Sequence, residues 1–143
     1  MTQPLPTDSN GSNFAPDFGL VKNNIPNTIT IKLGDNYEHR ATIGLNQNPK
    51  TFKLTFKNIS EADADILTNF FDERAIDGEN ISYTVPTESA SMKFVLDGAY
   101  TKTINFANIA TVSVTFRQVF DLTWVHRLIQ LQNYKNLIHQ KLL

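Results

Sequence analysis

Apolar and polar residues alternate along much of the chain between residues 25 and 120. In segments 28–33, 51–57 and 111–120, apolar side chains take every second position between Thr, Lys, Ser and Arg. Such alternation predicts strands with one face in a core and the other in water. Segments 81–85, 92–96 and 100–106 predict further strands, and Asp97-Gly98 predicts the turn of a hairpin between the last two.

The first of these segments runs into a turn signal. Ile29, Ile31 and Leu33 alternate with polar residues and predict a half-buried strand, and Gly34-Asp35-Asn36 follows directly. Gly adopts a positive φ without strain, and Asp and Asn tolerate the left-handed region because they bond their own backbone. The segment therefore predicts a β-hairpin that restarts at Tyr37.

One segment has helical periodicity and signals at both ends. Ser60 is a good N-cap, with Asp63 in the reciprocal capping role, and Gly78 stands where a left-handed stop is expected. Leu67 and Phe71 belong to an apolar stripe between them. We expect a helix over 60–77 packed on a sheet. The predicted fold is therefore α+β, an antiparallel β-sandwich or flattened barrel with one packed helix.

The two ends of the chain differ from this β-rich region, 25–121. Residues 1–24 are rich in Pro, Ser and Asn and predict an arm, whose apolar residues pack either on their own domain or on a neighbour. Residues 122–143 predict a C-terminal helical extension with an apolar stripe that includes Trp124 and Leu128. This helix could dock on its own domain, dock on a neighbour or lie on a membrane, although few basic residues favour lipid.

Composition limits the function classes. The chain has 143 residues, the size of one domain, and its 41% hydrophobic content includes ten Phe for a core. A net charge of -1 predicts that DNA is passed and not gripped. No cysteine is present and the three histidines lack ligand spacing, so we expect no metal. Without a signal peptide pattern or a long apolar run, we expect a soluble protein made in a cytoplasm, with no membrane partner.

Titratable residues are concentrated at the predicted hairpin. Asp35, Glu38, His39 and Arg40 stand close together in sequence, but on a strand Glu38 and Arg40 share one face while His39 points to the other. We interpret them as a solvated hairpin with cross-strand ion pairs. The glycines are scattered among turns and form no phosphate loop. The sequence predicts neither an enzyme nor a cofactor.

Three short motifs together resemble the phage minor tail protein M family: Asp17-Phe18-Gly19, the run from Gly34 to Arg40, and Gly44-Leu45-Asn46. The family's turn usually has Gly where this chain has Asn36, and Gln where it has His39. The similarity extends to Gln118-Val119-Phe120 and covers roughly three quarters of the chain as a pattern of spacings.

This resemblance implies a structural virion protein of the phage tail tip with a fold similar to tail-tube proteins. Members of the family form a ring, expected to be a homohexamer, that adapts the tail tube to the hub or baseplate and lets DNA pass. The implied partners are copies of itself, the tail tube protein and hub or central-fibre proteins, with the tape measure protein as a further candidate. Assembly would take place in the host cytoplasm.

The expected interface residues come from three segments. They are Phe14 and Phe18 in the arm, Gly34, Asp35, Tyr37 and Arg40 in the hairpin, and Trp124 and Leu128 in the terminal helix. Aromatic and Arg side chains dominate interface energetics, although Tyr37 could equally be a core residue.

The alternative function is a carbohydrate-binding β-sandwich module of a phage tail. Its aromatic set would favour Trp and Tyr, whereas Phe predominates in this chain.

Overall fold

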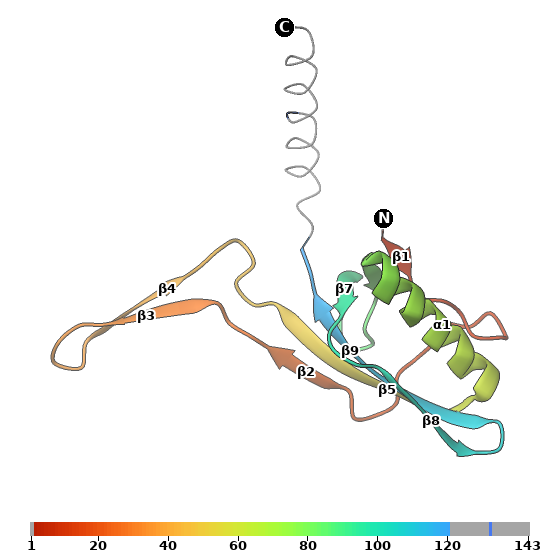
Figure 1. The fold of residues 1–143 in the computed structure, drawn as a ribbon. Helices are drawn as coiled ribbons and strands as arrows, with labels where there is room; N and C mark the ends of the chain where they lie inside the picture. Colours follow the sequence, from red (N-terminus) through yellow and green to blue (C-terminus); the bar gives the residue numbers. More distant parts are fainter. Residues whose placement is uncertain (1, 121–131, 133–143) are drawn as a thin grey trace, which may run out of the picture.

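Two long antiparallel strands, β5 (Lys50–Ser60) and β9 (Ile109–Gln118), form the centre of the fold. The computed structural model describes residues 2–120 and Gln132 (Figure 1). The main sheet is curled and carries the helix α1 (Glu61–Asp77) on one face. The other strands are β1 (Gln3–Pro4), β2 (Val21–Asn24), β3 (Thr28–Lys32), β4 (Glu38–Thr42), β6 (Ile81–Tyr83), β7 (Met92–Leu96) and β8 (Thr101–Phe106).

The main sheet has seven strands in the order β1-β6-β7-β9-β5-β2, and β8 also pairs with β9. All pairings are antiparallel except that of β1 with β6. Strands β3 and β4 form a second sheet of two strands whose residues are all exposed. The α+β class is confirmed. Of the two predicted architectures, the sandwich is wrong, because in the described part of the chain the second sheet projects away from the first instead of packing on it (Figure 1). The main sheet curls like a half-barrel, which is closer to the predicted flattened barrel.

The core lies between α1 and one face of the sheet. Phe52, Leu54 and Phe56 of β5 are buried opposite Phe116, Val114 and Val112 of β9, as the alternation predicts. The Phe116 ring lies 5.9 Å from the Phe71 ring of α1 and 5.7 Å from the Phe94 ring of β7, measured between centroids. The polar residues between them face away, so this side of the sheet has no covering layer among the described residues.

Helix α1 begins and ends where the sequence predicts. The Ser60 hydroxyl accepts a 3.1 Å hydrogen bond from the Asp63 backbone N–H and donates to Asp63 Oδ2 at 2.6 Å. Asp63 Oδ1 also accepts from the Ser9 N–H at 2.8 Å, and these bonds lower the pKa of Asp63, that of Ser60 most strongly. Gly78 ends the helix at φ 65°, with its N–H bonded to the Arg74 carbonyl.

Residues 2–24 lie along their own domain. They supply the first and last strands in the strand order of the main sheet, because β1 pairs with β6 and β2 pairs with β5. Phe14 lies between these strands in sequence and is only 6% exposed, with its ring centroid 6.0 Å from that of Phe56. Of the two alternatives for this arm, packing on its own domain therefore applies to Phe14. The predicted extension 122–143 lies outside the described residues, except for Gln132.

The predicted hairpin at Asp97-Gly98 is wrong. Strands β7 and β8 do not pair with each other; both pair with β9, β7 along its second half and β8 along its first half. The Asp97 N–H donates to the Thr115 carbonyl at 2.9 Å, so the segment that connects β7 to β8 runs alongside β9. The actual hairpin joins β8 to β9 through Ala107 and Asn108, and Asn108 has a φ of 63°.

Candidate interaction surfaces

The two-stranded sheet projects as an arm from the edge of the main sheet (Figure 1). We call residues 25–49, which join β2 to β5, the β-arm. Its strands pair in the register Ile29 with Ala41 and Ile31 with His39. At its base, the Asn27 N–H donates to the Gln47 carbonyl at 2.7 Å, so the two sides of the β-arm stay together beyond β3 and β4.

The β-arm has one apolar face and one polar face. The apolar face carries Ile29, Ile31, Leu33, Tyr37, His39 and Ala41, since residues paired across a hairpin point to the same side. Its large apolar side chains remain about half exposed or more, and Tyr37 is 73% exposed. The alternation therefore predicts the strands correctly. The expected burial of their apolar face in a core is wrong, because no other described residues of the chain cover this face.

The polar face carries Arg40 beside Thr30. Arg40 forms an ion pair with Glu38, two residues earlier on the same strand. The predicted ion pairing is therefore present but links neighbours on one strand and does not cross the hairpin. His39 lies on the opposite face, as predicted, and is separated from both charges by the backbone.

The tip of the β-arm is a tight turn. Asp35 and Asn36 both have positive φ, 58° and 63°, which confirms the prediction for these two residues. Gly34 does not, so the expectation of a positive φ at the glycine is wrong. Its carbonyl instead accepts the Tyr37 N–H at 3.4 Å, and the turn closes around the two polar residues.

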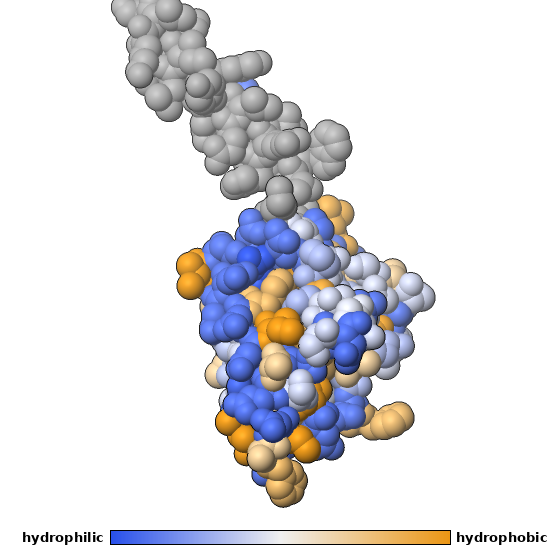
Figure 2. All heavy atoms as spheres, turned by 90° about the vertical axis from the view of Figure 1, so that its right-hand side faces the viewer, coloured by the Kyte–Doolittle hydropathy of each residue, from blue (hydrophilic) through white to orange (hydrophobic). Residues whose placement is uncertain are grey.

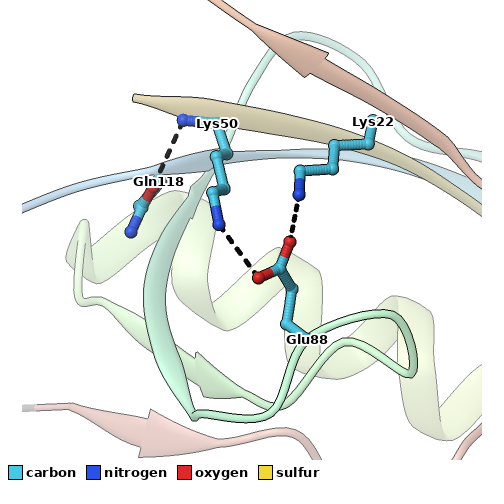
Figure 3. A network of polar contacts seen from close by, with 4 residues as sticks. All are labelled: Lys22, Lys50, Glu88 and Gln118. Carbon is cyan, nitrogen blue, oxygen red and sulfur yellow. Dashed lines mark hydrogen bonds and ion pairs between the residues drawn. The ribbon is translucent and has the colours of Figure 1, made fainter. Parts of the chain in front are cut away.

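An ion-pair network holds the two strands from which the β-arm emerges (Figure 3). Glu88, in the loop after β6, binds Lys22 of β2 through Oε1 and Lys50 of β5 through Oε2, the latter at 2.9 Å. The Lys50 N–H also donates to Gln118 Oε1 at 3.2 Å. Lys22, and then Lys50, lower the pKa of Glu88 because they stabilise the carboxylate. The base of the β-arm is thus fixed on both sides.

The Asp17-Phe18-Gly19 motif caps an open edge of β5. The Asp17 N–H donates to the Thr55 carbonyl at 2.9 Å, and Asp17 Oδ2 accepts the Lys57 N–H at the same distance. These bonds satisfy strand-edge groups beyond the end of β2. Gly19 has a φ of 99°, and Phe18, between the two, is fully exposed.

A second set of exposed apolar residues lies at the far end of the sheet. Ile104 and Phe106 of β8 and Ile109 of β9 are exposed, with Phe106 at 72%. Figure 2 views the molecule from this end and shows hydrophobic atoms gathered at the lower margin of the face. We call these three residues the β8 tip. The sequence predicts the strand but does not single out these residues, because alternation does not reveal whether an apolar side is exposed.

The predicted interface residues are therefore distributed unevenly. Phe18, Gly34, Asp35, Tyr37 and Arg40 lie on the surface, the last four together on the β-arm. Phe14 belongs to the core, and Trp124 and Leu128 lie outside the described residues. Glu88 was not predicted, and no local pattern around it would have indicated its two lysine partners.

The described residues contain no group of three or more His, Asp or Glu side chains placed to hold a metal ion. No helix among them is long and apolar enough to cross a membrane.

Comparison with known proteins gives a family. No curated protein matches the sequence. A sequence model of the family described as phage minor tail protein matches residues 12–120, which include the core, α1, the β-arm and the β8 tip. Since this match covers well over half of the 143 residues, the chain belongs to the phage minor tail protein family.

Proposed function

We propose that this protein forms a ring at the phage tail tip, which adapts the tail tube to the hub or baseplate and lets DNA pass through. Membership of the family makes it a structural component of the phage tail. The observation that carries the finer proposal is the β-arm, whose apolar face no other described part of the chain covers.

An isolated two-stranded hairpin is at best marginally stable in water. Exposing Ile29, Ile31, Leu33 and Tyr37 together also leaves a contiguous apolar strip on the surface. Strips of this kind mark interaction sites in soluble proteins. Contact with other subunits would cover this strip. Assembly therefore explains why the β-arm exposes apolar side chains in the isolated chain.

The side chains exposed on the β-arm favour other copies and tail components as partners. Tyr37 and Arg40 are exposed side chains of the two types that contribute most to interfaces. Neighbouring copies would form a homohexameric ring. The tail tube protein, hub or central-fibre proteins and the tape measure protein would contact its two ends. Phe18 is a further candidate contact, and so are Trp124 and Leu128 in the extension 122–143.

The overall charge suits a channel through which DNA moves. A net charge of -1 provides no surplus of Lys and Arg to neutralise phosphates, so DNA would pass without tight binding. The ring would be assembled in the host cytoplasm and then remain in the virion. None of these roles needs catalytic turnover.

Separate Tyr37→Ala and Arg40→Ala variants test the proposal. Ring formation is measured by size-exclusion chromatography with light scattering, and monomer stability by thermal unfolding. Loss of assembly with unchanged unfolding is expected for either, because both side chains are exposed on the β-arm. Unchanged assembly in both would remove the β-arm from the interface. A wild-type chain that stays monomeric and binds glycans would favour the carbohydrate-binding module instead.

A further inference from the structure

Strand β8 has one unpaired side. It pairs with β9, and no other strand among the described residues pairs with it. The N–H and C=O groups along its outer side therefore form a template for another strand. Natural proteins usually protect such an edge or use it for association.

The faces of β8 match those of the β-arm. On β8, Ile104 lies opposite the buried Ala110, while Thr101 and Thr103 point to the other side of the sheet. On β3, Ile29 and Ile31 alternate with threonines in the same way. A strand of the β-arm placed beside β8 would therefore set an Ile of β3 beside Ile104 and a Thr beside Thr103, and both are favourable cross-strand neighbours. Lys102, which shares the face of Ile104 and forms an ion pair with Asp65 of α1, is the exception.

The lengths also agree. Strand β8 has six residues, and β3 and β4 have five each. Pairing could therefore run along β8 and set the apolar face of the β-arm beside Ile104. Main-chain hydrogen bonds and apolar burial would then act in the same contact. Phe106 pairs with Ile109, which precedes Ala110 in β9, so these two side chains lie on the other face of the sheet, beyond the irregularity after Ile104.

The β-arm of the same molecule does not pair with its β8 edge. The β-arm and the β8 tip lie at opposite ends of the molecule (Figure 1). A contact between two different surfaces of identical copies is heterologous, and such contacts close into rings when the rotation between copies allows. Pairing of two β-arms with each other would instead be isologous, would stop at a dimer and would leave β8 open.

We infer that the β-arm of one copy adds to the outer edge of β8 in the next copy, with its apolar face beside Ile104. This inference rests on the proposed ring and names the surface that receives each arm. It assigns β8 and Ile104 to the subunit interface.

Cross-linking of single-cysteine variants tests this contact, because the wild-type chain has no cysteine. Thr30→Cys places a thiol on the polar face of the β-arm, and Thr103→Cys places one on the same face of β8. Both residues are exposed and neither belongs to the apolar contact. Thr84→Cys, at an exposed threonine just after β6, is the matched control. Pairs of full-length variants are mixed, treated with a short bismaleimide and separated on denaturing gels, while light scattering records the oligomeric state.

A cross-linked dimer is expected from the mixture of Thr30→Cys with Thr103→Cys and is expected to be lost when either is mixed with Thr84→Cys. A chain that carries both Thr30→Cys and Thr103→Cys should give a ladder that ends at the number of copies in the ring. Dimers of Thr30→Cys alone would show isologous pairing and overturn the inference. Oligomers without the mixed dimer would overturn it but leave the proposed ring standing. A chain that stays monomeric and without cross-links would overturn both.

Discussion

The strongest test of whether the β-arm drives assembly is to replace the apolar side chains of its face while its strands are kept. The triple variant Ile29→Thr, Ile31→Thr, Leu33→Thr keeps β-propensity high, because Thr is β-branched. The three side chains are 47, 52 and 58% exposed, so about half of each remains to be buried in an assembly. Complete burial of Ile or Leu contributes about 1.5–3 kcal/mol, which makes each half worth about 1 kcal/mol.

The loss is therefore about 3 kcal/mol per subunit contact. Since about 1.4 kcal/mol corresponds to a factor of ten, the association constant of each contact should fall roughly 100-fold. Sedimentation velocity across a dilution series measures this change. Thermal unfolding of the monomer, followed by circular dichroism, should show the same midpoint as the wild type, because the β-arm lies outside the core.

The control alters the other face of the same hairpin. Thr28→Ser, Thr30→Ser, Thr42→Ser changes three residues of the polar face and weakens strand propensity without removing large apolar side chains. Equal loss of assembly in the two triple variants would show that strand formation matters and apolar burial does not. Wild-type assembly of the Ile and Leu variant would refute the reasoning altogether.

Three further predictions concern the scaffold. Phe116→Ala should lower the free energy of unfolding by about 3–5 kcal/mol in chemical denaturation, because it empties a fully buried site, whereas Phe18→Ala at an exposed site should change it by less than about 0.5 kcal/mol. Ser60→Ala should cost about 1 kcal/mol in the same assay by removing the cap of α1, and Ser60→Thr should retain most of it. The pKa of Glu88 is lowered from its ordinary value of 4.5, so its ion pairs contribute fully above pH 4.5 and are lost as the pH falls through the lower folded value. Glu88→Gln should remove this part of the pH dependence of thermal unfolding, and an unchanged pH profile would exclude the network at the base of the β-arm.

The sequence by itself determined the local elements. Ser60 and Gly78 specify the two ends of α1 through hydrogen bonds within a few residues, so their effect does not depend on the rest of the fold. The alternation in 51–57 and 111–120 likewise gives the central strands and the side of each that is buried. The turn at Asp35 and Asn36 follows from local backbone preference.

The tertiary structure alone decided what covers each strand. Segments 28–33 and 51–57 share the same alternation, yet only the second lies under a helix, since the pattern records an apolar face and not its partner. The pairing of β7 and β8 along one strand, and the meeting of Lys22, Lys50 and Glu88, likewise join positions far apart in the chain. Such contacts form only when the whole chain folds and brings distant segments together. The residues next to each position in the sequence do not indicate its partner.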